Sequence, residues 1–174
     1  MSSYNFKIVL LGEGSVGKTS LTLRYVSNVF DDAHQSTLQA SFLKKQIYLD
    51  QDQVKLSIWD TAGQEKFHAL GPIYYRESNG ALLVYDVLCP KSLEKVRVWA
   101  KELRSMLGDD VCIAIVANKI DLLPIPEQRN PHTNALISEA LTLCSRLPNA
   151  RHHTTSAKTD TGINELFISI SRRK

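Results

Sequence analysis

Short apolar runs recur along the chain and predict buried strands. Residues 6–11, 81–85 and 111–117 are apolar at nearly every position, a pattern typical of strands covered on both faces of a parallel sheet. Residues 42–49 and 54–59 instead alternate between apolar and polar side chains and are separated by a short polar turn. This alternation predicts an antiparallel hairpin.

Between the strands, the apolar residues have the spacing of helices. They predict a helix that starts at Ser92 as its N-cap and stops at Gly108, and a weakly helical stretch that leads to Tyr75. Residues 122–134 hold three prolines, and we expect an extended Pro-rich surface loop there. The other elements are expected as helices at residues 20–26, 135–147 and 163–170, a loop at residues 28–39, and a short strand or loop at residues 152–156.

Strands that alternate with helices predict an α/β fold. We expect a six-stranded, mostly parallel sheet with helices on both faces, in which the hairpin supplies one antiparallel edge strand. The 174 residues are enough to bury a core without disulfides or metals, and they predict a single domain over residues 1–174.

Composition narrows the classes of function. The net charge is +3, and the Lys and Arg residues are scattered, so we expect no nucleic-acid partner. The three cysteines, Cys89, Cys112 and Cys144, have no C-x-x-C spacing, which favours a reducing compartment with Cys112 and Cys144 packed in the core. No apolar run reaches membrane-spanning length and no signal-peptide pattern opens the chain, so a cytoplasmic protein is expected.

The segment GEGSVGKT, residues 12–19, lies between the first predicted strand and the first helix. Its glycines let the backbone wrap round an anion, so that N–H groups and the helix N-terminus point at phosphate oxygens. Lys18 would reach the β- and γ-phosphates, and the Thr19 hydroxyl would bind Mg²⁺. The alternative is a glycine-rich turn that binds no ligand.

Three other polar segments follow predicted strands, at the sheet edge where such folds bind ligands. Residues 60–64 place the Asp60 carboxylate where it can hold Mg²⁺ and a glycine N–H where it can meet a γ-phosphate. Residues 118–121 bring an aspartate that can accept two hydrogen bonds from guanine, a donor pair that adenine lacks. Residues 156–158 can cap the guanine O6 with a backbone N–H. Taken alone, Asp60 could be a helix cap, and Asn118 with Asp121 could be a solvated turn.

The segments GEGSVGKT, DTAGQE, NKID and TSAK, in this order, resemble the guanine-nucleotide-binding set of the Ras superfamily of small GTPases over nearly the whole chain. WDTAGQE and the Tyr74-Tyr75-Arg76 that follows narrow the resemblance to the Rab family. Residues 37–42 and 67–76 are similar to the early-endosomal Rab branch numbered twenty-one. The implied fold is a P-loop small-GTPase domain, and the implied activity is slow hydrolysis of GTP to GDP with Mg²⁺.

The resemblance also implies roles for single residues. Gln64 would orient the attacking water, while Lys18 and Gly63 stabilise the transferring phosphoryl group. Thr37 would complete the Mg²⁺ coordination with Thr19 and Asp60. The implied nucleotide-binding set is Gly14, Ser15, Val16, Gly17, Lys18, Thr19, Ser20, Phe30, Thr37, Gly63, Asn118, Lys119, Asp121, Ser156, Ala157 and Lys158, with Phe30 at the edge of the guanine and Lys119 along its face.

The implied output is a change of partner. Residues 31–41 and 63–75 would be switch loops that order with GTP, and Phe42, Trp59 and Tyr74 would form an effector-reading surface. Ordinary sheet packing is the alternative for Phe42 and Trp59. With no evident arginine in cis, an activating protein would supply one. A guanine nucleotide exchange factor and a Rab escort protein or GDP dissociation inhibitor are the other implied partners.

Some features depart from the family pattern. Residues 122–134 are longer than expected and could be a lineage-specific insertion or a private partner site. His152 and His153 could be solvated or packed side chains or a pH switch. Members of the family attach to the cytosolic face of membranes through prenylated C-terminal cysteines, and the resemblance implies endosomal membranes here. This sequence has no cysteine at its C-terminus, so we expect the lipidated tail to be absent from it. Two rival functions are a guanine-nucleotide scaffold without hydrolysis and a P-loop ATPase.

Overall fold

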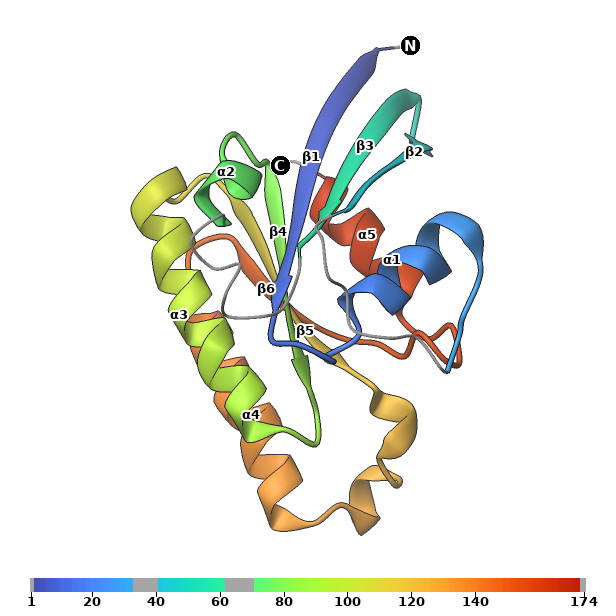
Figure 1. Cartoon of the computed structure of the whole chain (residues 1–174). Coiled ribbons are helices and arrows are strands. Elements are labelled where there is room, and N and C mark those ends of the chain that lie inside the picture. Colours follow the sequence, from blue (N-terminus) through green and yellow to red (C-terminus); the bar gives the residue numbers. More distant parts are fainter. Residues whose placement is uncertain (1, 33–40, 62–70, 173–174) are drawn as a thin grey trace.

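The apolar runs form the strands of the sheet in Figure 1. The computed structural model describes residues 2–32, 41–61 and 71–172, and these form a six-stranded sheet in the order β2-β3-β1-β4-β5-β6. Every neighbouring pair is parallel except β2 with β3, which confirms the predicted mostly parallel sheet with one antiparallel edge strand. The strands are β1 (Ser3–Gly12), β2 (Ser41–Leu49), β3 (Asp52–Asp60), β4 (Gly80–Asp86), β5 (Cys112–Asn118) and β6 (Ala150–Thr154).

Helices cover both faces of the sheet (Figure 1). Helices α1 (Lys18–Ser27) and α5 (Ile163–Ser171) pack on one face, where the Tyr25 and Phe167 rings stack with centroids 3.9 Å apart. Helices α3 (Pro90–Leu107) and α4 (Pro131–Ser145) pack on the other, while the short α2 (Gly71–Tyr75) precedes β4. Strands β1, β4 and β5 are covered on both faces, which explains their continuous apolar runs.

The start of α3 differs from the prediction. The helix begins at Pro90, with Cys89 rather than Ser92 at the N-cap, so the N-cap assignment was wrong. Proline has no N–H to satisfy and its fixed φ suits the first helical position. Ser92 lies inside the first turn, where its Oγ accepts a hydrogen bond from the Asp86 N–H at 2.9 Å and donates one to the Cys89 carbonyl at 2.6 Å.

The proline-rich segment is more regular than expected. Short 3-10 helices occupy Ile120–Leu122 and Pro126–Gln128, and α4 starts at Pro131, inside the stretch for which a loop was predicted. The Asn130 side chain caps α4 by accepting the Thr133 N–H at 2.8 Å. The prediction failed there because it treated prolines as breakers, whereas Pro126 and Pro131 each lie at a helix start.

The cysteines are free thiols at the margins of the core. Cys112 packs against the core on the α1 and α5 side, and Cys144 against the core on the α3 and α4 side. Both are only partly buried, so the prediction that they pack in the core is confirmed in part. Burial raises the pKa of the Cys144 thiol. Over residues 2–32, 41–61 and 71–172, no helix has the length and apolar character that a bilayer crossing requires.

Candidate nucleotide-binding site

The loop of residues 12–19 lies at the carboxyl end of β1, in the middle of the sheet. Because β3, β4, β5 and β6 run parallel to β1, their carboxyl ends meet at the same edge. Each polar segment identified from the sequence follows one of these ends. The sheet thereby collects segments that lie far apart along the chain.

Two glycines of the loop are required by its shape. Gly17 has a φ of 96°, in the left-handed region, and a Cβ there would lie 2.4 Å from Asn118 Nδ2. At Gly12 a Cβ would lie 2.7 Å from the Val84 carbonyl oxygen. The loop therefore lies directly against β4 and β5, closer than any side chain would allow.

Lys18 is a buried cation within this loop. Its side chain is only 5% exposed, and its Nζ donates to the Gly12 carbonyl at 3.0 Å. Burial lowers the pKa of Lys18 to about 8, with the Asp60 and Glu13 carboxylates acting in the opposite direction. A buried ammonium with such a lowered pKa favours an anionic partner, because an anion restores the stability of its charged form.

Thr19 and Asp60 meet as the metal assignment requires. The Thr19 hydroxyl donates to Asp60 Oδ2 at 2.5 Å, and Asp60 is 1% exposed at the end of β3. A hydroxyl and a buried carboxylate are hard oxygen ligands, so this pair fits Mg²⁺. The remaining residues predicted to meet the γ-phosphate, the metal or the water are Thr37, Gly63 and Gln64, and they lie outside the described residues.

Asn118 ties the phosphate loop to the far side of the site. Its Nδ2 donates to the Val16 carbonyl at 2.8 Å, and its Oδ1 accepts from Thr155 Oγ1 at 3.0 Å. Asn118 is 1% exposed and Thr155 is fully buried. The sequence pattern assigned Asn118 to the nucleotide but missed Thr155, whose position directly before the SAK segment was the available signal.

Lys119 and Asp121 are held in place by their neighbours. Lys119 Nζ donates to the Ser15 carbonyl at 2.6 Å and pairs with Asp86 Oδ2 at 2.9 Å. Asp121 Oδ1 accepts from Ser156 Oγ at 2.6 Å, which leaves its second carboxylate oxygen for a further donor. Asp86, at the end of β4, was missed because nothing near it in the chain marks it.

The last segment is anchored by α1. Arg24 donates from Nε to the Ala157 carbonyl at 2.8 Å and from Nη2 to the Lys158 carbonyl at 3.0 Å. The same guanidinium lies 5.9 Å from the centroid of the Phe30 ring, so the two predicted base neighbours, Phe30 and Ala157, share one anchor. Ser20 lies half-buried in the first turn of α1, next to Thr19. Arg24 was not found from the sequence.

The comparison with known proteins agrees with this geometry. A model of the Ras family matches residues 7–174. The chain belongs to the Ras family. Its relatives include "Ras-related protein Rab-21" of Mus musculus, 55% identical over 98% of this chain and 73% of that protein. The Rab-21 protein of Dictyostelium discoideum is 47% identical over 97% of this chain and 76% of that protein. "GTP-binding protein ypt5" of Schizosaccharomyces pombe is 43% identical over 97% of this chain and 77% of that protein.

These identities place the chain among the Rab small GTPases, which hydrolyse GTP to GDP. The aromatic residues expected to form the effector-reading surface of this Rab chain are contiguous. The Phe42 and Trp59 ring centroids lie 4.8 Å apart across the β2–β3 ladder, and those of Trp59 and Tyr74 lie 6.0 Å apart. Phe42 remains 41% exposed. Trp59 and Tyr74 are half-buried and pack against the core on the α3 and α4 side, so the row of rings runs from the core to the exposed Phe42.

Proposed function

We propose that this Rab GTPase binds guanine nucleotide at the edge described above and uses it as a switch. The observation that carries this proposal is the set of side-chain hydrogen bonds that join the predicted segments: Thr19 to Asp60, Asn118 to Val16 and Thr155, and Asp121 to Ser156. The residues that would bind phosphate, metal and base thus lie along one sheet edge. Such convergence is what a single nucleotide requires.

The roles follow from the positions of these groups. The N–H groups of residues 14–19 and the Lys18 ammonium bind the phosphates, and Thr19 and Asp60 hold Mg²⁺ together with Thr37. When bound, Mg²⁺ neutralises charge on the β- and γ-phosphates. Asp121 accepts the guanine N1–H and amine, and Gln64 orients the water. Positioning and electrostatics would carry the hydrolysis, so turnover without an activator is slow.

Rab GTPases work with exchange factors, activating proteins, GDP dissociation inhibitors and effectors. For this chain we propose effectors that read Phe42, Trp59 and Tyr74 with the switch loops, and an activator that supplies an arginine. The Rab-21 relatives support a place on the cytosolic face of endosomal membranes, with attachment through a C-terminal lipid.

Competition between nucleotides tests the base assignment. Protein loaded with labelled GDP should lose the label to excess unlabelled GTP and keep it in the same excess of ATP, because adenine offers Asp121 no matching donor pair. Effective displacement by ATP would end the guanine assignment in favour of the ATPase alternative.

The Thr19→Asn variant tests the metal assignment. It should weaken Mg²⁺-dependent GTP binding by about tenfold, because it removes the hydroxyl that meets Asp60. Thr142→Asn, the same change on the exposed part of α4, should leave the GTP affinity unaltered. An unaltered GTP affinity in Thr19→Asn would contradict the metal role.

Single-turnover hydrolysis separates the GTPase from the binding-only scaffold. Gln64→Leu should retain nucleotide affinity and slow the hydrolytic step about tenfold or more, because the water loses its orienting group. Gln128→Leu, on the exposed 3-10 helix, is the matched control with an unchanged rate. Equal rates in wild type and Gln64→Leu would remove Gln64 from its role, and no hydrolysis in wild type would favour the scaffold.

A further inference from the structure

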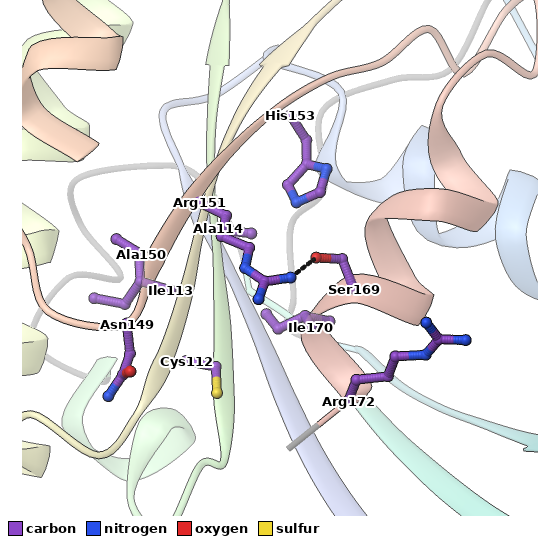
Figure 2. A pocket seen from close by; sticks show the side chains of 10 residues that line it. All are labelled: Cys112, Ile113, Ala114, Asn149, Ala150, Arg151, His153, Ser169, Ile170 and Arg172. Carbon is purple, nitrogen blue, oxygen red and sulfur yellow. Dashed lines mark hydrogen bonds between the residues drawn. The ribbon is translucent and has the colours of Figure 1, made fainter. Parts of the chain in front are cut away.

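A pocket of about 240 Å³ lies between the first half of β5, β6 and the last turn of α5 (Figure 2). Its lining is Cys112, Ile113, Ala114, Asn149, Ala150, Arg151, His153, Ser169, Ile170 and Arg172, and we call it the α5–β6 pocket. Residues 112–114 begin β5, whereas the nucleotide segments follow the carboxyl ends of the strands. The α5–β6 pocket is therefore separate from the nucleotide site, and a ligand bound in it would not depend on the function proposed there.

Strand register explains why polar side chains face this hollow. In the parallel β5–β6 ladder, Arg151 pairs with Ala114 and His153 with Val116. Ala114 and Val116 belong to the core on the α5 face, so Arg151 and His153 point to that face as well. The side chains opposite Arg151 are small: Ala114 on β5 and Ser169 on α5. Small neighbours leave room that a packed core would have filled.

The lining is cationic. Arg151 Nη1 donates to Ser169 Oγ at 3.2 Å, and the Arg172 guanidinium lies on the same helix end. Figure 2 shows the His153 ring on the same side as these two groups. None of the ten lining residues is acidic. A guanidinium has five N–H donors, so one bond to Ser169 leaves Arg151 free to bind a further acceptor.

His153 supplies the second observation. Its Nε2 is buried from solvent and has no hydrogen-bond partner in the part of the chain that the structure describes. Burial, and then the charge of Arg151, lower the pKa of His153, which favours the neutral ring, and a neutral imidazole has one N–H that can donate. A buried polar atom without a partner costs stability, which a ligand oxygen would recover.

We propose that the α5–β6 pocket binds the phosphate group of a phosphate monoester. Such a group carries nearly two negative charges and three acceptor oxygens. Arg151 and Arg172 supply charge-assisted donors, the His153 ring supplies a neutral donor, and the Ser169 hydroxyl completes the set. The ester can come from a soluble metabolite or from a lipid headgroup, because both present the same phosphate chemistry.

The test uses the protein saturated with GDP and Mg²⁺, so that the nucleotide site is filled. Inorganic phosphate and glycerol 3-phosphate are titrated separately while the ring signals of His153 are followed by NMR. We expect saturable shifts at His153, with Arg151→Gln and Arg172→Gln each weakening the affinity about tenfold. Arg146→Gln, an exposed arginine outside the lining, is the charge-matched control and should change the affinity less than about twofold.

Vesicles distinguish the two sources. Phosphatidylcholine vesicles containing phosphatidic acid, a monoester, are compared with vesicles of equal surface charge containing phosphatidylglycerol, a diester. Preference for the monoester vesicles that is lost in Arg151→Gln assigns the site to a lipid headgroup. Saturable binding of glycerol 3-phosphate without that preference assigns it to a soluble ester.

Two results would overturn the proposal. One is the absence of saturable His153 shifts with both soluble probes and of any monoester preference on vesicles. The other is equal affinity in Arg151→Gln, Arg172→Gln and Arg146→Gln, which would place the binding elsewhere. Thermal melting of each variant verifies that it is folded, and Arg172→Gln, at the exposed end of α5, serves where Arg151→Gln is unstable.

Discussion

The two halves of the nucleotide edge are built differently. On the phosphate half, Lys18 and Asp60 are 5% and 1% exposed, and the loop lies against β4 and β5 so tightly that Gly12 and Gly17 cannot carry a Cβ. On the base half, Asp121 is exposed and is held by a single hydrogen bond from Ser156. The charged groups of the phosphate half are therefore buried, whereas the carboxylate that would read the base lies at the surface, beside the buried Ser156 and Ala157.

This difference predicts that the two halves fail in different ways. A change on the phosphate half should affect folding and affinity together, because the same contacts serve both. A change at the exposed Asp121 should affect selectivity and leave the fold intact. Asn118 joins the halves through Val16 and Thr155 and should show both effects.

Gly17→Ala should have the largest effect. The residue would be held at a φ of 96° with its Cβ 2.4 Å from Asn118 Nδ2, so the loop must open. We expect GDP affinity, measured by fluorescent-nucleotide titration, to fall about a hundredfold or more. The control is Gly108→Ala, also at positive φ but with open space around it; it should lose about 1 to 3 kcal/mol of stability and keep its affinity. Equal affinity in the two variants would refute the tight packing of the loop.

Asn118→Ala should lower both stability and affinity. It removes two buried hydrogen bonds and leaves the Val16 carbonyl without its donor, which costs about 2 to 3 kcal/mol in the free energy of unfolding. Thr155→Val removes one of the two links and should cost about half as much. Urea denaturation of the GDP-free and GDP-bound forms measures both, and a loss of affinity with unchanged stability would separate the halves completely.

At the base half, the two donors of guanine can be tested singly. Hypoxanthine nucleotides lack the exocyclic amine, so wild type should bind IDP about tenfold more weakly than GDP. Asp121→Ala should remove this preference and lower the melting temperature of the free protein by only a few degrees (about 2 to 4 °C), because Asp121 is exposed and the change withdraws only the acceptor of the buried Ser156 hydroxyl. A preference retained in Asp121→Ala would place base reading on other residues.

The smallest effect concerns pH. Burial lowers the pKa of Lys18 to about 8, and a bound phosphate would raise it again. Below pH 8 the cation is already present, so binding takes up little proton. Above pH 8 binding must take up a proton, and the affinity for GDP at pH 8.5 should be about fourfold lower than its value well below pH 8. Calorimetry in two buffers of different ionisation enthalpy measures the uptake; Lys18→Arg, which does not titrate in this range, should show none.

The sheet and the order of the site segments could be predicted from the sequence because both are local signals. Apolar runs identify buried strands, and the glycines and polar residues that follow them identify loops at the carboxyl ends. The helix starts at Pro90 and Pro131 were missed, because a proline can interrupt a helix or occupy its first position, and the sequence alone does not distinguish the two. The roles of Thr37 in metal binding and of Gln64 in orienting the water stay predictions, since both residues lie outside the described residues.

The supporting contacts of the site could not be predicted, since they join distant parts of the chain. Arg24 reaches a carbonyl 133 residues away, and Asn118 one 102 residues away. A hydrogen bond to a backbone carbonyl cannot be predicted from the type of the accepting residue, because every residue has a carbonyl. Asp86, the partner of Lys119, likewise follows an apolar strand as an ordinary polar residue would.

The strand order has a consequence for how the protein is made. The first strand synthesised, β1, is central in the sheet and pairs with β3 and β4, which leave the ribosome later. The phosphate loop after β1 gains its hydrogen bond from Asn118 only when β5 has been made, and Asn118 gains its own from Thr155 later still. Contacts of such long separation form slowly, and bound nucleotide stabilises only the chain that has made them all. Nucleotide capture should therefore be among the final steps of folding, and it would mark the moment at which a new chain becomes resistant to proteolysis.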